Sequence, residues 1–223
     1  FNTLYQLYAL KEKRPDLLER AGCLLLMPDL FLYLLTGRRQ AEFTIASTGQ
    51  MVNPWQGDWD RALIERLGLP MHLLCPLVHP GRMADPLSPQ ICRELGVEPI
   101  PTAVVTSHDT ASAVVAVPAD GEDFVYISSG TWSLMGIESK KPLINDQTFS
   151  FNFTNEGGFN RTTRFLKNIM GLWLIQESRR QWIREGAQVT YADLEREALV
   201  CEPFRSLIDP DEEELGFPGD MPG

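Results

Sequence analysis

The sequence predicts an α/β protein of two parts, a helix-rich first part and a second part that opens with a β-hairpin. In the first hundred residues, apolar side chains recur with the spacing of helices between prolines. A run of branched apolar residues at 102–107 is typical of a buried strand. Two alternating segments, 124–129 and 132–138, enclose a Gly-Thr turn.

The composition is that of a globular protein. The chain has 223 residues, of which 43% are hydrophobic and 22% charged, so a disordered chain is excluded. A formal net charge of -10 argues against nucleic acid or an anionic membrane as a partner. No segment is long and apolar enough to cross a membrane, and no secretory signal is visible. The four cysteines lie far apart, which favours free thiols, a cytoplasmic location and no protein metal site.

Short helices are expected in the first part. Leu4, Leu7 and Leu10 have helical spacing, and Asp60 is placed to cap a helix that Gly68 ends. Helices are predicted up to residue 13 and at 15–20, 29–36, 60–67 and 90–95, with proline-rich loops in 69–101.

The chain divides near residue 120. Before this point, the strand at 102–107 leads into a helix of small residues at 109–117. After it, the predicted elements are the hairpin, a third strand at 149–154, a long amphipathic helix at 164–184, and a last helix through 199 that Thr190 caps.

His108, Asp109 and Thr110 stand where the predicted strand meets the predicted helix. Such a junction exposes side chains at a sheet edge, beside free backbone N–H groups. Asp109 is either a base or metal-facing carboxylate, with His108 and Thr110 as hydrogen-bonding partners of a substrate, or it is simply the helix cap. The local pattern alone favours the cap.

The turn Ser128-Ser129-Gly130-Thr131 lies between the two hairpin strands. Its small residues allow backbone N–H groups to approach a phosphate, and Thr131 can donate a hydroxyl hydrogen bond. A plain hairpin turn is the simpler interpretation, and the pattern favours it. The P-loop and GxGxxG motifs are absent from the sequence, which excludes those two kinds of nucleotide site.

Asn168 and Gln176 are eight residues apart and would share one face of the predicted long helix. Amides in this position can orient the hydroxyl groups of a ligand, or they can lie at the wet edge of the helix. The wet edge is favoured without other information.

Four segments in this order resemble the FGGY carbohydrate kinases of the actin-like ATPase superfamily. They are HisAspThrAlaSerAlaVal from His108, SerSerGlyThrTrpSerLeuMetGly from Ser128, ThrAsnGluGlyGly from Thr154 and LeuLysAsnIleMetGlyLeuTrpLeu from Leu166. The likeness extends over nearly the whole chain, and within the family it is to the kinases of L-rhamnulose.

The resemblance implies part of a two-lobed, ribonuclease-H-like kinase. Residues 1–118 would be the later part of the N-terminal sugar-binding lobe, and residues 119–223 the first part of the C-terminal ATP-binding lobe. By resemblance, Asp109 accepts the proton of the sugar hydroxyl, and the sugar, L-rhamnulose, contacts His108, Asp109, Thr110 and Asn168. Thr131 and Gln176 would contact ATP, which is expected with Mg²⁺.

The chain begins without methionine and ends in a loop, so we expect an excerpt of a longer chain. The glycine-rich phosphate loop and the later adenosine-binding segment of the family have no counterpart here. The excerpt alone is therefore expected to be a poor catalyst or none. The alternatives are a related kinase that acts on another ketose and a non-catalytic sugar-binding fragment.

Overall fold

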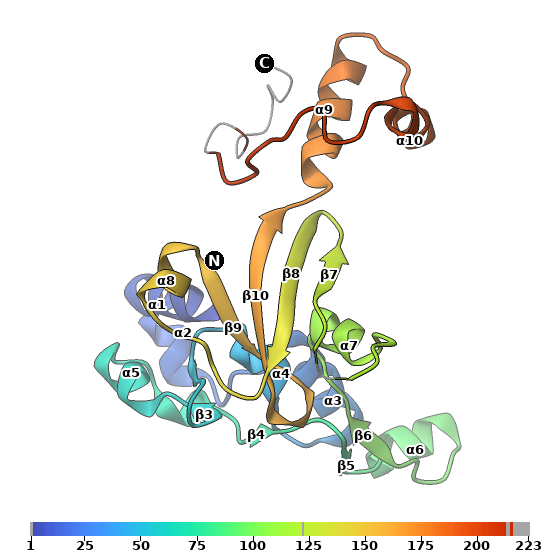
Figure 1. Cartoon of the computed structure of the whole chain (residues 1–223). Helices are drawn as coiled ribbons and strands as arrows, with labels where there is room; N and C mark the ends of the chain where they lie inside the picture. Colours follow the sequence, from blue (N-terminus) through green and yellow to red (C-terminus); the bar gives the residue numbers. More distant parts are fainter. Residues whose placement is uncertain (1, 122, 213–214, 216–223) are drawn as a thin grey trace. The chain divides into compact units, whose positions relative to one another are not determined.

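The computed structural model describes residues 2–121, 123–212 and 215 of the chain (Figure 1). The chain divides into two compact units. The first comprises residues 1–125 and 136–166, and the second comprises residues 126–135 and 167–223. Residues 136–166 thus follow the hairpin turn in sequence but belong to the first unit.

Three short helices supply part of the apolar core of the first unit. They are α1 (Thr3–Lys13), α2 (Pro15–Arg20) and α5 (Arg61–Arg66). The Asp60 side chain caps α5, because its Oδ1 accepts from the Leu63 backbone N–H at 3.0 Å. The buried core consists of Leu4, Leu7, Leu18, Ala41, Ala46, Met51, Trp59, Ile64, Leu69, Leu73 and Cys75. The predicted helical spacing in this region is confirmed.

The remaining elements of residues 1–125 are short. The helical ones are α3 (Met27–Thr36), α4 (Phe43–Ser47), η1 (Met71–Leu73), α6 (Pro89–Leu95) and α7 (Asp109–Val115). The strands form three pairs: β1 (Ala41–Glu42) parallel to β4 (Leu77–Val78), β2 (Val52–Asn53) antiparallel to β3 (Asp58–Trp59), and β5 (Arg82–Ala84) antiparallel to β6 (Thr102–Val104). Sequence analysis predicted the β6–α7 junction but missed α4 and five of these six strands.

The later strands form a four-stranded sheet in the order β7-β8-β10-β9. These are β7 (Tyr126–Ser129), β8 (Trp132–Ser139), β9 (Phe153–Gly157) and β10 (Thr163–Met170). The helix α8 (Asp146–Ser150) and the turn η2 (Phe159–Arg161) lie within the connections. The predicted hairpin is confirmed as β7 and β8.

Two of the predicted elements are wrong. The predicted strand at 149–154 begins instead as helix α8, because Asn145 and Thr148 form a capping box, and the strand β9 follows it. The predicted helix at 164–184 is divided into β10 and α9 (Trp173–Arg184). The apolar residues before Gly171 fit helical spacing, but pairing within the sheet outweighs that local preference.

The second unit ends in two helices, α9 and α10 (Tyr191–Val200). The predicted Thr190 cap of α10 is confirmed and is one half of a capping box: Thr190 Oγ1 accepts from Asp193 N, and the Asp193 carboxylate accepts from Thr190 N. Hydrogen bonds from Thr190 and Arg196 lower the pKa of Asp193 to about 2. No helix in the described part of the chain is long and apolar enough to cross a membrane.

Candidate active site

Asp109 is the first residue of α7, in the first unit. The residue at the N-cap position is His108, so Asp109 is not the helix cap, although its Oδ1 accepts from the Thr110 backbone N–H at 2.7 Å. Its side chain is 94% exposed. A carboxylate held in this way can accept a proton or hydrogen bond from a molecule in solvent.

His108 lies beside this carboxylate, and its side chain is only 17% exposed. The His108 Nε2 atom lies 3.3 Å from Asp109 Oδ1, and the Nδ1 atom lies 2.7 Å from Nη2 of Arg164. An arginine can only donate, so Nδ1 must accept and the ring proton is on Nε2. The ring proton of His108 is therefore on the nitrogen that faces Asp109 Oδ1.

Burial and the Arg164 charge lower the pKa of His108, while Glu156, Asp109 and Glu42 act in the opposite direction. The net direction favours the neutral ring, which agrees with an acceptor at Nδ1.

Arg164, on β10, is fully buried. Its Nη2 donates to Glu156 Oε2 at 2.7 Å as well as to His108, and its Nε donates to the Gly157 carbonyl at 3.2 Å. Its Nη1 has no hydrogen-bond partner among the described residues. The guanidinium thus links strands β9 and β10 to the residue before α7.

A second buried carboxylate, Glu42, holds the backbone before α7. Its Oε2 accepts from the Ser107 backbone N–H at 3.1 Å and from the Ser107 hydroxyl at 2.7 Å. Its Oε1 accepts from the Thr44 backbone N–H at 2.8 Å, so the same side chain caps α4. Thr44 Oγ1 in turn accepts from the His108 backbone N–H at 3.3 Å. Glu42 and Thr44 therefore hold the backbone at residues 107 and 108.

Asp29 supports Glu42 from α3. Its Oδ1 accepts from the Glu42 backbone N–H at 2.9 Å, while its Oδ2 is buried without a partner among the described residues. Burial, reinforced by the nearby Glu42 charge, raises the pKa of Asp29 to about 6.

Thr110 is buried, and its hydroxyl lies 3.5 Å from Asp109 Oδ1. Its side chain therefore lies against Asp109. The structure brings His108, Asp109 and Thr110 together, as expected of neighbours at one helix start.

In the second unit, Thr131 lies in the turn between β7 and β8 with its side chain exposed. Its carbonyl accepts from Trp173 N at 3.1 Å, and the Gly130 carbonyl accepts from Leu172 N at 3.0 Å. A Cβ on Gly171 would lie 2.8 Å from the Gly130 carbonyl oxygen and from Ser133 N. The turn is therefore joined through backbone atoms to the segment that begins α9.

Asn168 and Gln176 do not share a helix, so the predicted common face is wrong. Asn168 is exposed on β10, and Gln176 is half-buried on α9. The cause is the division of the predicted helix at Gly171, because residues on a strand and on a helix follow different periods.

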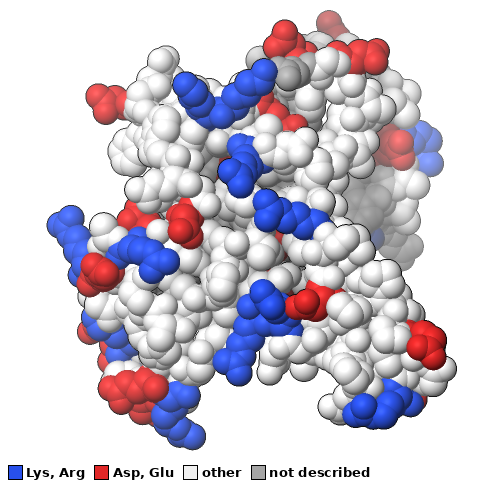
Figure 2. Space-filling view, turned by 90° about the horizontal axis from the view of Figure 1, so that it is seen from below, with Lys and Arg blue, Asp and Glu red and all other residues white. Residues whose placement is uncertain are grey.

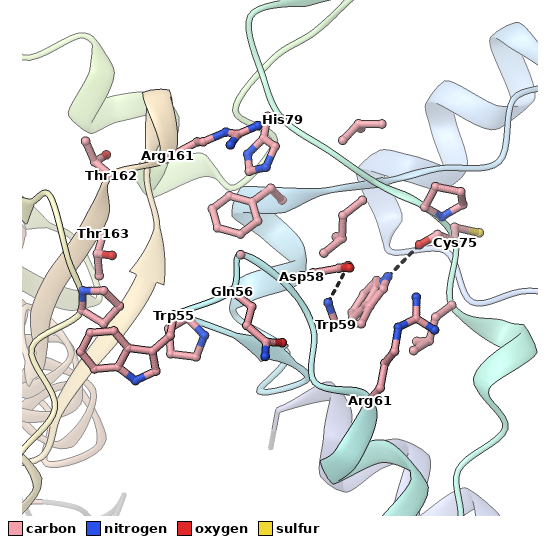
Figure 3. Close-up of a pocket in the computed structure, with 18 of the residues that line it drawn as sticks. Trp55, Gln56, Asp58, Trp59, Arg61, Cys75, His79, Arg161, Thr162 and Thr163 are labelled. Atoms are coloured by element: carbon pink, nitrogen blue, oxygen red, sulfur yellow. Dashed lines mark hydrogen bonds between the residues drawn. The ribbon is translucent and has the colours of Figure 1, made fainter.

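A cavity of about 1010 Å³ lies elsewhere in the first unit, and none of the predicted site residues lines it. In Figure 3 the Trp59 indole donates to the Cys75 carbonyl, at 2.8 Å, and Arg161 lies beside His79. Asp58 is the one acidic residue among its lining side chains, and the cationic ones are Arg61, Arg82, Lys140, Lys141 and Arg161. Figure 2 likewise shows several Lys and Arg side chains across one face of the molecule.

Sequence reasoning gave no role to Glu42, Glu156 or Arg164. Arg164 carried no distinct signal, because it follows the polar residues 160–163 and a second arginine, Arg161, lies three positions earlier. Among the residues that the structure describes, no group of three or more His, Cys, Asp or Glu side chains is arranged to hold a metal ion.

Known protein families and curated relatives match nearly the whole chain. Residues 1–116 match the N-terminal domain of the FGGY family of carbohydrate kinases, and residues 125–223 match its C-terminal domain. The chain is 44% identical over 221 residues to a rhamnulokinase of Bacteroides thetaiotaomicron, and 43% identical over 221 residues to one of Oceanobacillus iheyensis. These matches cover 99% of the chain but only 45% and 46% of the relatives, so the chain spans less than half of their length.

Solved structures show the same fold. A ligand-bound xylulose kinase from Lactobacillus acidophilus matches 90% of the chain and 40% of its own, with a TM-score of 0.76 at 17% identity. A xylulose kinase from Rhodospirillum rubrum matches 91% of the chain and 41% of its own, with a TM-score of 0.72 at 15% identity. The predicted α/β fold class, that of the actin-like sugar kinases, is confirmed. The chain belongs to the FGGY family of carbohydrate kinases.

Proposed function

We propose that this protein is an ATP-dependent sugar kinase that converts L-rhamnulose and ATP to L-rhamnulose 1-phosphate and ADP. The exposed Asp109 carboxylate at the start of α7, with Nε2 of His108 3.3 Å from its Oδ1, is the observation that carries the proposal. The reaction needs a carboxylate in this state, and the relatives of 43–44% identity named rhamnulokinase suggest the sugar.

In the proposed reaction, Asp109 accepts the proton of the sugar hydroxyl as its oxygen attacks the γ-phosphorus of ATP. The bond between that phosphorus and the bridging oxygen of ADP breaks, and ADP leaves with the electron pair. Phosphoryl transfer depends mainly on positioning, and the contacts of His108 and Glu42 supply it for Asp109 and its backbone.

His108, Thr110 and Asn168 are proposed to contact the sugar, and Thr131 and Gln176 the nucleotide. The turn at Thr131 supports its role, because its carbonyls are used in backbone hydrogen bonds while the threonine side chain stays exposed. Residues 1–118 would then be part of the sugar-binding lobe and residues 119–223 part of the ATP-binding lobe, in a cytoplasmic enzyme.

Magnesium is proposed to accompany ATP and to neutralise charge on its phosphates. The described residues do not offer a cluster of ligands for a metal ion, so the phosphates and water would provide most of its ligands. The steps assigned to this chain are therefore the orientation of the hydroxyl and the acceptance of its proton.

A sugar panel tests the proposal in the full-length protein. ADP release with MgATP is measured with L-rhamnulose, xylulose and gluconate in parallel, since a site that bonds particular hydroxyls discriminates strongly. We expect L-rhamnulose to give the highest kcat/KM. A higher kcat/KM with another sugar would make that sugar the proposed substrate. If ADP release does not depend on any sugar of a wider panel, the kinase proposal is contradicted.

A further inference from the structure

Arg164 is placed to control the proton of His108. The guanidinium donates from one nitrogen, Nη2, to both Glu156 Oε2 and His108 Nδ1, each at 2.7 Å. With Nδ1 accepting, the single ring proton of a neutral His108 is on Nε2, which faces Asp109 Oδ1 at 3.3 Å. The contacts form one continuous chain from Glu156 to Asp109.

Stability alone does not account for this arrangement. Arg164 is fully buried, and its Nη1 has no hydrogen-bond partner among the described residues. An unsatisfied buried donor is unfavourable for folding, and a buried ion pair is weak evidence for stability. The arrangement does, however, restrict Nδ1 of His108 to accepting a hydrogen bond.

We propose that Arg164, paired with Glu156, is a positioning residue that keeps His108 in the Nε2–H tautomer and so orients the carboxylate of Asp109. The assignment of Asp109 as the base rests on the proposed function, whereas the tautomer does not. Loss of the Arg164 donor would let the proton move to Nδ1, where Glu156 Oε2 lies 3.5 Å away. Nε2 would then present a lone pair to the Asp109 carboxylate.

Glu156 and Arg164 have distinguishable effects in this proposal. In Arg164→Lys the charge remains, but one ammonium group cannot reproduce the fork that contacts Glu156, Gly157 and His108 together. In Glu156→Gln a carbonyl oxygen can still accept from Arg164, so the donor to His108 is retained. Glu156→Gln is therefore the matched control.

The first measurement is the nitrogen spectrum of the protein with ¹⁵N-labelled histidine. The chain contains three histidines, and the His108 signal is assigned by its loss in His108→Gln. We expect an accepting Nδ1 and a protonated Nε2 in the wild type and in Glu156→Gln, and a mixture of tautomers in Arg164→Lys. A wild-type His108 protonated on Nδ1 would overturn the proposal, whether or not the protein is active.

The second measurement is sugar-dependent turnover in the same variants. In Arg164→Lys we expect kcat to fall about tenfold, which corresponds to the loss of about one charge-assisted hydrogen bond, and KM for the sugar to change much less. In Glu156→Gln we expect kcat to fall less than threefold. If Arg164→Lys keeps both the tautomer and kcat, Arg164 is not a positioning residue. If the wild type has the expected tautomer but no sugar supports turnover, the proposed function fails and the assignment of the tautomer stands.

Discussion

Around Asp109, the contacts that set the geometry are side-chain hydrogen bonds between ionisable groups, whereas around Thr131 they are hydrogen bonds between backbone atoms. His108, Arg164 and Glu156 form the first set within one unit. The carbonyls of Gly130 and Thr131, which accept from the start of α9, form the second set within the other unit.

The difference suits the two proposed roles. A base needs a defined protonation state and direction, and both depend on the ionisable groups around it. A turn that receives a phosphate needs close approach and a fixed backbone, which small residues and backbone hydrogen bonds supply. The comparison predicts that loss of a side-chain hydrogen-bond donor or proton acceptor affects the first region, and that added volume affects the second.

The largest effect is expected for Asp109→Asn. An amide cannot accept the proton of the sugar hydroxyl, so kcat should fall by about 10²- to 10⁴-fold. The substitution is nearly isosteric at an exposed side chain, so the melting temperature should change little. Turnover and thermal unfolding on the same preparation check this, and a kcat within threefold of the wild type would remove Asp109 from the mechanism.

The next effect is expected for Gly171→Ala. The added Cβ would lie 2.6 to 2.8 Å from Ser133 and Gly130 atoms, two of which are backbone atoms that cannot move away. We expect a loss of about 1–3 kcal/mol in the free energy of unfolding. Gly22→Ala is the control, because the nearest atom to the added Cβ would be at the flexible end of the Arg39 side chain, 3.9 Å away. If Gly171→Ala and the wild type have equal free energies of unfolding in urea, the turn does not depend on this close approach.

A smaller, pH-dependent effect is expected for Asp29→Asn. The pKa of Asp29 is about 6 in the folded state, whereas its ordinary value is 3.8. The folded state therefore binds the proton more tightly than the unfolded state, and this carboxyl opposes folding increasingly as pH rises from about 4 through 6. An asparagine oxygen can still accept from Glu42 N. The difference between variant and wild type in the free energy of unfolding should therefore favour the variant by about 1 kcal/mol more at pH 8 than at pH 5. A difference that stays constant across this range would contradict the raised pKa.

His108 should affect the pH dependence of stability in the opposite direction to Asp29. Its folded-state pKa is lowered, so its contribution to stability is complete above about 6.5 and is lost as pH falls through that value toward the folded pKa. The groups that face it are Arg164, Glu156, Asp109 and Glu42. His108→Gln should reduce the loss of stability between pH 7.5 and pH 5. The free energy of unfolding is measured in urea at both pH values, and an equal loss in the variant and the wild type would argue against a buried neutral ring.

The smallest effect is expected for Thr131→Ala. The backbone hydrogen bonds of the turn use carbonyl groups and are retained, so stability should be nearly unchanged. Loss of one hydroxyl donor to a phosphate should raise KM for ATP about fivefold, the equivalent of about 1 kcal/mol. An unchanged KM for ATP would remove the Thr131 hydroxyl from the nucleotide site.

Local sequence signals predicted several elements because local forces determine them. Prolines and caps placed α2, α5 and α10, and the Gly-Thr pair placed the hairpin. The strand β10 was mistaken for helix because Leu166, Ile169 and Met170 also fit helical spacing, and only pairing with distant strands decides between the two.

The candidate site was predictable in part for the same reason. His108, Asp109 and Thr110 are adjacent in sequence, so a junction motif identifies them together. Arg164 contacts His108 across 56 positions and Glu42 contacts Ser107 across 65, and a single sequence carries no local signal for such contacts.

The most direct test of the two-region account measures ATP affinity and sugar-dependent ADP release together on Asp109→Asn. Asp146→Asn is the control, since Asp146 is likewise an exposed carboxylate at the first position of a short helix. We predict that Asp109→Asn binds ATP as the wild type does but releases ADP at least 100-fold more slowly, an effect of the order expected for a lost general base, while Asp146→Asn matches the wild type in both. Wild-type ADP release by Asp109→Asn, or an equal loss in Asp146→Asn, would contradict the account.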